Sequence, residues 1–382
     1  MNQDIAEALA RQDWVEAAQH IQALPAEDPW RLLYQGQLYE GQQEWSLAES
    51  TYRQLLQSDV VPKLMREARQ GIQRIQDSQT AQQEQQQERI QQQIAQTVAA
   101  GSTEPGVLIL DAIAPEQKTE AARHFATIMQ TDPYTARLQL PSRGSRLYRS
   151  GAIGELQGYG QALIDAGIPA FWATLKQIEP IKVYAVRYFV SIEDPVEVKV
   201  VKPDAGGASK SLTFSWSEVS QWVEGQLPIL EEVVDLTPRG KLQRKIQTQD
   251  HAQVWDLHLP QRQCILRFYD AIYHFHEGVQ LAELASQTTG GQRSSWAHWQ
   301  GFAALLAQKL GDRPAWKDFT PFAETAVDHP DTLNRLSSHI HLLRRIDSDW
   351  DPAFHLYSSL AFLRQPTMEP LNTWTEATVP QR

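Results

Sequence analysis

The sequence predicts an α+β protein of several domains, with helical hairpins first, strands in the middle and helices near the C-terminus. The chain has 382 residues, more than one ordinary hydrophobic core accommodates. Apolar residues recur every three or four positions in its first fifth and again near its end, which is typical of amphipathic helices. Between these regions lie short apolar or alternating runs separated by turn residues, as expected for strands.

Composition indicates a folded, soluble protein. Hydrophobic residues make up 42% of the chain, and 12 tryptophans add apolar surface to bury. The single cysteine, Cys264, excludes an intramolecular disulfide and a thiolate-rich metal site, and it suits a reducing compartment. The first residues lack the basic and apolar regions of a signal peptide, and no run approaches the ~18 uncharged apolar residues of a membrane span. We therefore expect a cytoplasmic protein.

Charge argues against nucleic acid as a general partner. The net charge is −11, and residues 1–100 hold 14 acidic and 8 basic residues, so 6 of the 11 excess negative charges lie there. Binding to nucleic acid needs a positive surface that displaces counterions. We expect no general nucleic-acid binding.

Residues 1–76 are expected to form paired helices, separated at Pro25, Pro29 and Pro62. Within Trp30–Pro62, a large, a glycine, an aromatic, an alanine, a second aromatic and an aliphatic residue follow one another over one repeat of about 34 residues. These positions are Leu32, Gly36, Tyr39, Ala48, Tyr52 and Leu55. By them the segment resembles tetratricopeptide repeats, in which the small residues mark the place where two helices cross closely.

A degenerate earlier repeat is expected, because Ala17 and Ile21 precede Ala48 and Tyr52 by 31 residues. The resemblance implies binding of a protein partner in a groove lined by the first helix of each repeat. Four residues occupy such groove positions: Trp30, Leu33, Gln37 and Glu40. The first two would be exposed apolar anchors for a partner. Alternatively, they pack against the preceding hairpin.

Residues 77–105 are expected to link the helical hairpins to the rest of the chain. Gln79–Gln96 contains ten glutamines among eighteen residues, a composition typical of a solvated helix or a disordered linker. Ile90, Ile94 and Val98 follow at intervals of four, so part of the segment is predicted to be helical. This helix leaves homo-oligomer formation open.

Residues 106–177 predict a small α+β domain with the order β-α-α-β-α-β. The expected elements are Val107–Leu110, Pro115–Met129, Pro133–Leu140, Arg146–Arg149, Ile153–Ala166 and Ile168–Leu175. Asp132 is expected to cap the second helix and Gly167 to end the third. This pattern resembles the C-terminal domain of the ribosomal stalk protein.

Residues 178–290 predict an antiparallel, barrel-like domain, and residues 291–365 a helical region. The expected strands are Lys182–Val190, Val196–Lys202, Ser211–Trp216, Lys241–Thr248, Gln253–Leu259, Cys264–Tyr269 and Ile272–Phe275. A helical excursion is expected at Ser217–Gly225. Seven strands before a helix resemble a pleckstrin-homology-like barrel. The expected helices are Ser294–Leu310, Leu333–Ile346 and Ala353–Leu363, and residues 366–382 are expected to form a tail.

Four arginines gather within thirteen residues of the small α+β domain: Arg137, Arg143, Arg146 and Arg149. In an acidic protein such a group is suited to hold a carboxylate, a phosphate or an acidic partner. The alternative is that these side chains are solvated and balance neighbouring acids.

Other candidate motifs favour ordinary structural roles. His274 and His276 would share one face of a strand, but no carboxylate stands at a matching spacing, and His339 and His341 would point apart on a helix. The segment Asp347–Pro352 lacks the glycine of a calcium loop, and we expect Asp351 to cap the following helix. We identify no catalytic set, phosphate loop, metal site or cofactor site.

The leading hypothesis is therefore a non-enzymatic scaffold or adaptor that binds protein partners and assists assembly of a larger complex. This hypothesis rests on the resemblance to tetratricopeptide repeats and on the lack of a recognisable catalytic motif. The resemblance alone is not enough, because a fold does not fix a function. The alternative is a sensor that binds a small anionic ligand or nucleotide through its central domains.

Overall fold

The computed structural model describes residues 2–57, 61–202, 209–236, 242–279 and 295–364, and the predicted tail lies outside them. The chain is a mixed α and β protein that divides into two compact units, Met1–Gln91 and Gln92–Arg382. The finer domain boundaries expected from the sequence stay predictions. Among the described helices none has both the length and the apolar composition needed to cross a bilayer.

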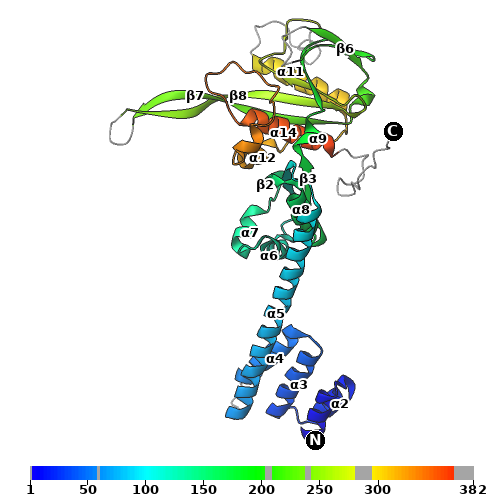
Figure 1. Ribbon diagram of the computed structural model, residues 1–382, viewed down its shortest axis with the longest axis vertical. Helices are drawn as coiled ribbons and strands as arrows, with labels where there is room; N and C mark the ends of the chain where they lie inside the picture. The colour runs from blue at the N-terminus through cyan, green and yellow to red at the C-terminus, as the bar shows by residue number, and fades with distance from the viewer. Residues whose placement is uncertain (1, 58–60, 203–208, 237–241, 280–294, 365–382) are drawn as a thin grey trace. The chain divides into compact units, whose positions relative to one another are not determined.

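The first unit is built from helices that pair along the chain. They are α1 (Asn2–Ala10), α2 (Trp14–Ala23), α3 (Pro29–Gly41), α4 (Trp45–Gln57) and the first half of α5 (Pro62–Ala100) (Figure 1). Helix α1 contacts α2, and α3 contacts α4. Asp28 caps α3 by accepting a hydrogen bond from the Trp30 amide at 2.9 Å, and Pro29 occupies the first turn.

Glycines let three helices of this unit approach closely. Tyr52 of α4 is fully buried between Gly36 of α3 and Gly71 of α5. A Cβ at either glycine would lie 2.5 Å from the Tyr52 ring, which is well inside contact distance. The small residue expected at the helix crossing therefore has the predicted physical role at Gly36.

The second unit begins with a three-stranded antiparallel sheet in the order β2-β1-β3. Its elements are β1 (Pro105–Asp111), α6 (Lys118–Met129), α7 (Pro133–Gln139), β2 (Ser145–Ala152), α8 (Ile153–Asp165) and β3 (Ala170–Thr174). The predicted order of strands and helices is confirmed. Asp132 caps α7 through the Thr135 amide at 2.9 Å, and Gly167 adopts a φ of +77° after α8, as predicted.

A larger mixed sheet follows, in the order β10-β7-β8-β9-β4-β5-β6. Its strands are β4 (Lys182–Ser191), β5 (Val196–Val201), β6 (Lys210–Phe214), β7 (Gln221–Leu236), β8 (Leu242–Leu259), β9 (Cys264–Tyr269) and β10 (Ala315–Trp316). The helical elements around it are α9 (Leu175–Ile178), η1 (Trp216–Glu218), η2 (Pro260–Arg262), α11 (Ser295–Leu310), α12 (Phe319–Ala326), α13 (Pro330–Leu333) and α14 (Trp350–Leu363).

The expected antiparallel barrel is wrong. Among the described residues neither sheet closes, and β4–β9 and β10–β7 pair in parallel. The helix expected at Ser217–Gly225 is also wrong beyond the single turn of η1, because β7 starts at Gln221 and turns Val223 and Gly225 into the core. No strand forms at Ile272–Phe275, where the chain turns instead.

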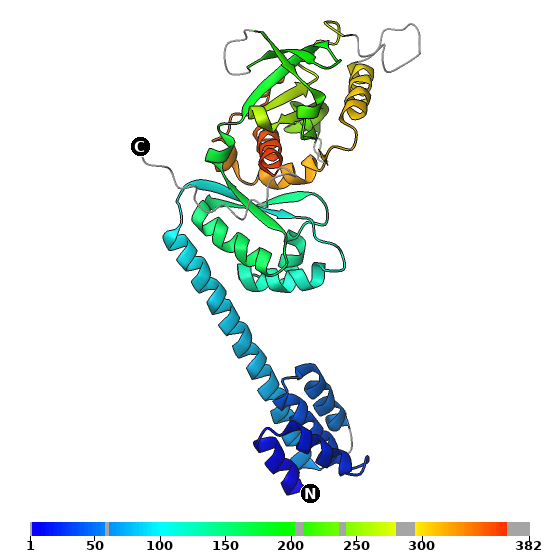
Figure 2. The same cartoon turned by 90° about the vertical axis from the view of Figure 1, so that its right-hand side faces the viewer.

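One core joins the two sheets. It contains Val107 and Phe171 of the small sheet, Leu227 of the large sheet, and Phe322 and Leu360 of α12 and α14. Figure 2 shows α12 and α14 above the small sheet and α6 and α8 below it. The face of the small sheet that carries Val107 and Phe171 is thus buried against the C-terminal helices.

The helix expected at Leu333–Ile346 is wrong, because tertiary contacts hold this segment in an irregular path after α13. The carbonyl oxygen of Ser338 accepts a hydrogen bond from Arg267 at 2.6 Å. The His341 amide donates to the Tyr269 hydroxyl at 3.4 Å, and His339 has a φ of +53°. Polar groups of the sheet have therefore replaced the intrahelical bonds that the apolar spacing predicted.

Candidate functional site

Trp30 of the predicted groove lies where two clusters of the first unit meet. It is half-buried, stacks on Tyr34 with ring centroids 5.8 Å apart, and contacts both the α1–α2 cluster and the α3–α5 cluster. The Lys63 ammonium lies 5.5 Å from the centroid of the Trp30 ring, within the range of a cation–π interaction. Part of this aromatic surface stays open to solvent beside a positive charge.

The other predicted groove residues differ in their surroundings. Leu33 is 2% exposed and packs in the core with Ala48 and Leu64, so its expected role as an exposed anchor is wrong. The spacing that predicted a groove position also fits a helix covered by its neighbours on two sides. Gln37 is half-buried on the same helix.

Glu40 takes part in a clamp between three helices of the first unit. Its carboxylate accepts two hydrogen bonds from Arg74 of α5, at 2.7 and 2.9 Å, and one from the Tyr52 hydroxyl of α4 at 2.7 Å. Burial and the adjacent carboxylate raise the pKa of Tyr52 far above its usual range, so the phenol remains a donor. Glu40 therefore fixes α3 against α4 and α5.

Two of the four predicted anion-binding arginines already hold partners within the second unit. Arg146 donates to the carbonyl oxygens of Leu138 and Gln139 at 3.2 and 3.3 Å, at the C-terminal end of α7. Arg149 pairs with Glu155 at 3.2 Å and lies 4.9 Å from the Tyr159 ring centroid. Arg137 and Arg143 are exposed. An anion site at these arginines stays a prediction.

The histidine pairs have separate neighbours. His274 lies 2.7 Å from Glu277 through Nδ1 and 3.1 Å from Arg187 through Nε2. His339 meets His355 edge to face, with centroids 4.8 Å apart. In the described part of the chain no three His, Cys, Asp or Glu side chains are grouped so that they would hold a metal ion.

Asp351 does not cap α14, contrary to expectation. The helix starts at Trp350, and Asp351 is 6% exposed and forms an ion pair with Arg344. Arg344 also donates to the Pro228 carbonyl oxygen at 3.2 Å. Burial raises the pKa of Asp351 to about 6, although the adjacent guanidinium opposes this change.

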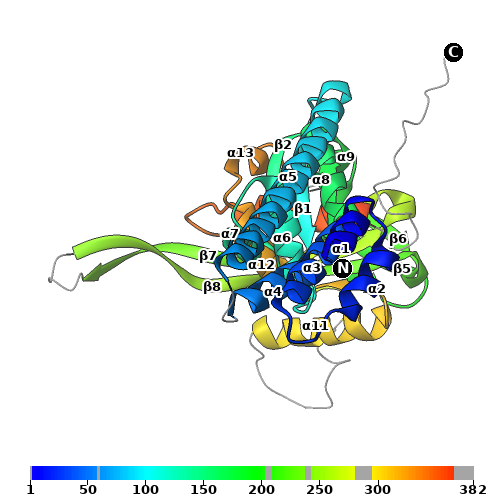
Figure 3. The same cartoon turned by 90° about the horizontal axis from the view of Figure 1, so that it is seen from below.

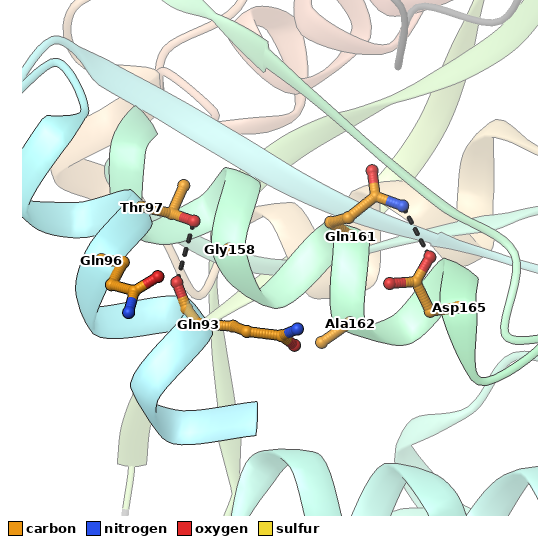
Figure 4. A pocket seen from close by; sticks show the side chains of 7 residues that line it. All are labelled: Gln93, Gln96, Thr97, Gly158, Gln161, Ala162 and Asp165. Carbon is orange, nitrogen blue, oxygen red and sulfur yellow. Dashed lines mark hydrogen bonds between the residues drawn. The ribbon is translucent and has the colours of Figure 1, made fainter. Parts of the chain in front are cut away.

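A polar pocket of about 260 Å³ lies between the last turns of α5 and helix α8. Figure 4 shows Gln93, Gln96 and Thr97 facing Gln161 and Asp165 across it. The Gln161 amide donates to Asp165 at 2.7 Å. Among the seven residues that line the pocket none is cationic, so its lining does not suit an anion.

The second unit also contains a buried chain of hydrogen bonds that joins β7, β8 and β9 to α14. Arg267 donates to both oxygens of the Asp256 carboxylate, at 2.8 and 2.7 Å, and the Ser358 hydroxyl donates to the same carboxylate at 2.5 Å. His258 Nε2 lies 3.0 Å from Ser358 Oγ, and its Nδ1 lies 3.1 Å from Gln221 Nε2. All five residues are at most 1% exposed.

The hydrogen-bond partners of His258 determine which of its ring nitrogens carries the proton. Because Gln221 donates to Nδ1, the imidazole proton sits on Nε2 and is donated to Ser358, whose hydroxyl proton goes to Asp256. Burial lowers the pKa of His258 to about 4, which outweighs the attraction of Asp256. In a hydrolase with a Ser-His-Asp triad, the aspartate carboxylate orients the histidine, whereas in this cluster the carboxylate of Asp256 pairs with Arg267. The cluster is suited to hold α14 on the sheet.

Sequence reasoning missed this cluster, although a signal was present. Asp256, His258 and Arg267 interrupt otherwise apolar strands, and charged residues inside such runs are rarely buried unless they are paired. The partner Ser358 lies 102 residues after Asp256 in a helix, so its role depended on the tertiary fold. Comparisons of the chain with protein-family models, curated proteins and solved structures each found no match.

Proposed function

We propose that the protein is a non-enzymatic scaffold or adaptor whose first unit, Met1–Gln91, holds a protein partner during assembly of a larger complex. The observation that carries the proposal is the half-buried Trp30 with Lys63 above its ring. Tryptophan is one of the residue types enriched at the energetic centre of protein interfaces. Its partner would bring an apolar side chain to the ring and a carboxylate to Lys63.

The clamp at Glu40 supports this proposal, because a rigid surface loses little conformational entropy on binding. Arg74 and Tyr52 hold Glu40 from two other helices. Trp30 itself lies in the first turn of α3, at the capped end of that helix. A partner would therefore meet a prearranged aromatic surface.

The test is affinity capture from native lysate with the full chain, with Trp30→Ala and with a matched control, Trp45→Ala. Trp45 is another half-buried tryptophan of the same unit, at the start of α4. We expect a defined protein to be retained by the wild type and by the control and lost with Trp30→Ala, while far-UV circular dichroism stays unchanged. Equal loss with both variants, or retention by both, would contradict the proposal.

The sensor hypothesis ranks second. Arg146 and Arg149 already have partners within the chain, and the polar pocket has no cationic lining residue. Deleting residues 1–91 separates the two hypotheses, because it removes the proposed partner surface and leaves the central arginines in place.

A further inference from the structure

Strands β7 and β8 continue beyond the large sheet as a two-stranded arm (Figures 1 and 3). Strand β9 pairs with β8 from Val254 to Leu259, and β10 pairs with β7 at Trp222 and Val223. Further out, Pro228–Leu236 and Leu242–His251 pair with each other. Residues 242–251 are all exposed, so within the described chain nothing covers this part of β8.

One face of the arm is rich in apolar side chains. Because side chains alternate along a strand, the residues paired as Leu230 with Thr248, Glu232 with Ile246 and Val234 with Arg244 share this face, together with Leu242. Val234, Ile246 and Leu242 are 61%, 61% and 76% exposed. We call these seven residues the arm face. Two-stranded ribbons are at best marginally stable in water, and an exposed apolar group of this kind marks a contact surface.

The charges on the arm face are balanced and symmetric. Glu232 and Arg244 stand in adjacent cross-strand pairs, with Arg244 Nη1 3.7 Å from Glu232 Oε2. Each is flanked across the ribbon by an exposed apolar residue, Ile246 or Val234. The face thus presents one acid and one base among apolar side chains, and it carries no net charge for a charged partner to match.

Such a face is complementary to itself. When two arm faces pack together, a two-fold axis can lie between them and run perpendicular to the strands. This axis places the pair Glu232–Ile246 of one copy opposite the pair Val234–Arg244 of the other. Glu232 of one copy then lies in the same row as Arg244 of the other, about one strand spacing of 4.8 Å to the side. The two glutamates stand in different rows, about 6.6 Å apart along the strands. Contacts of this isologous kind are the commonest in soluble homo-oligomers.

We propose that the arm face binds a second copy of this chain, with the two faces packed together and Glu232 of each copy beside Arg244 of the other. The inference is independent of the proposed partner at Trp30, since that residue lies in the other unit. The sequence left homo-oligomer formation open through the glutamine-rich helix, and the arm is a different surface from that helix.

The test is sedimentation of the full chain over a range of concentrations, with Glu232→Arg and Arg244→Glu as separate variants. Both variants break the pair within a chain, and each places like charges across the proposed interface. We expect the wild type to dimerise and each variant to bind its own copy at least ten-fold more weakly. An equimolar mixture of the two variants should regain the dimer, because arginine at 232 then faces glutamate at 244.

Recovery on mixing identifies contact between copies, since mixing cannot repair the pair within either chain. Glu231→Arg is the matched control: it reverses an exposed charge at the neighbouring position, on the opposite face, and should leave dimerisation unchanged. A monomeric wild type at the highest soluble concentration would overturn the inference. So would a dimer that neither reversal weakens, or a mixture that stays monomeric while the variants retain wild-type circular dichroism.

Discussion

Replacing Arg267 by methionine should strongly destabilise the second unit. The substitution keeps most of the apolar stem and removes the guanidinium from Asp256, which is fully buried. Asp256 would retain the Ser358 hydroxyl as a donor and lose both bonds from Arg267. Removing one partner of a buried ion pair costs about 3–5 kcal/mol. The carbonyl oxygen of Ser338 also loses its donor, which adds about 1 kcal/mol.

The assay is urea unfolding followed by tryptophan fluorescence, since nine of the twelve tryptophans lie after Gln91. The double variant Asp256→Leu, Arg267→Met should be more stable than Arg267→Met, because it leaves no unpaired buried charge. A loss of less than about 1 kcal/mol in the single variant would refute the reasoning. Strictly additive losses in the double variant would refute it as well.

Three further predictions concern His258, Gly71 and Cys264. The pKa of His258 is about 4 in the folded protein and 6.5 ordinarily, so below pH 6.5 the unfolded chain binds a proton that the folded chain does not. The contribution of His258 to stability should therefore fall by about 3 kcal/mol from pH 6.5 to 4. Asp351, whose pKa is raised to about 6, acts in the opposite direction over this range, so the test is the difference between the wild type and His258→Gln in urea titrations at the two pH values. Gly71→Ala should cost about 1–3 kcal/mol in thermal unfolding, because the new Cβ would clash with Tyr52, and Tyr52→Leu should relieve the clash. Cys264 is 2% exposed and burial raises the pKa of its thiol to about 11, so thiol reagents should modify it only in denaturant.

Local patterns predicted much of the helical structure and the order along the chain of the strands and helices of the small α+β region. Caps such as Asp132 and Gly167 act on their immediate neighbours, so the sequence alone specifies them. The spacing of Gly36 and Tyr52 likewise predicted a close helix crossing. These elements depend on contacts between residues near in sequence.

The arm and the large sheet depend on pairing between distant residues, and here prediction failed. Strand β7 contains Pro228, which disfavours a strand because proline has no backbone N–H to donate, but at an edge position no such donor is needed. Lys241–Thr248 and Gln253–Leu259 were expected as separate strands, whereas a register shift at Ile229/Leu230 lets β8 run through both. Parallel pairing of β4 with β9 joins residues about 80 positions apart, which no local pattern indicates.

At the candidate site, too, the sequence indicated features that depend on near neighbours and missed those that depend on distant residues. The sequence singled out Trp30, and its aromatic surface remains partly open, while its role in binding stays a prediction. It misjudged Leu33, because the same helical spacing serves a groove and a core. It also missed the cluster around Asp256, whose members come from four separate elements.

The central claim, that a protein partner binds at Trp30, is tested most directly by cross-linking the captured complex with an amine-reactive reagent and mapping the linked peptides. Lys63 is the one lysine among residues 1–91, so a link to the first unit through a lysine reports this position alone. We predict links between Lys63 and the partner that disappear with Trp30→Ala. Links confined to lysines after Gln91, in a complex that survives Trp30→Ala, would contradict the account.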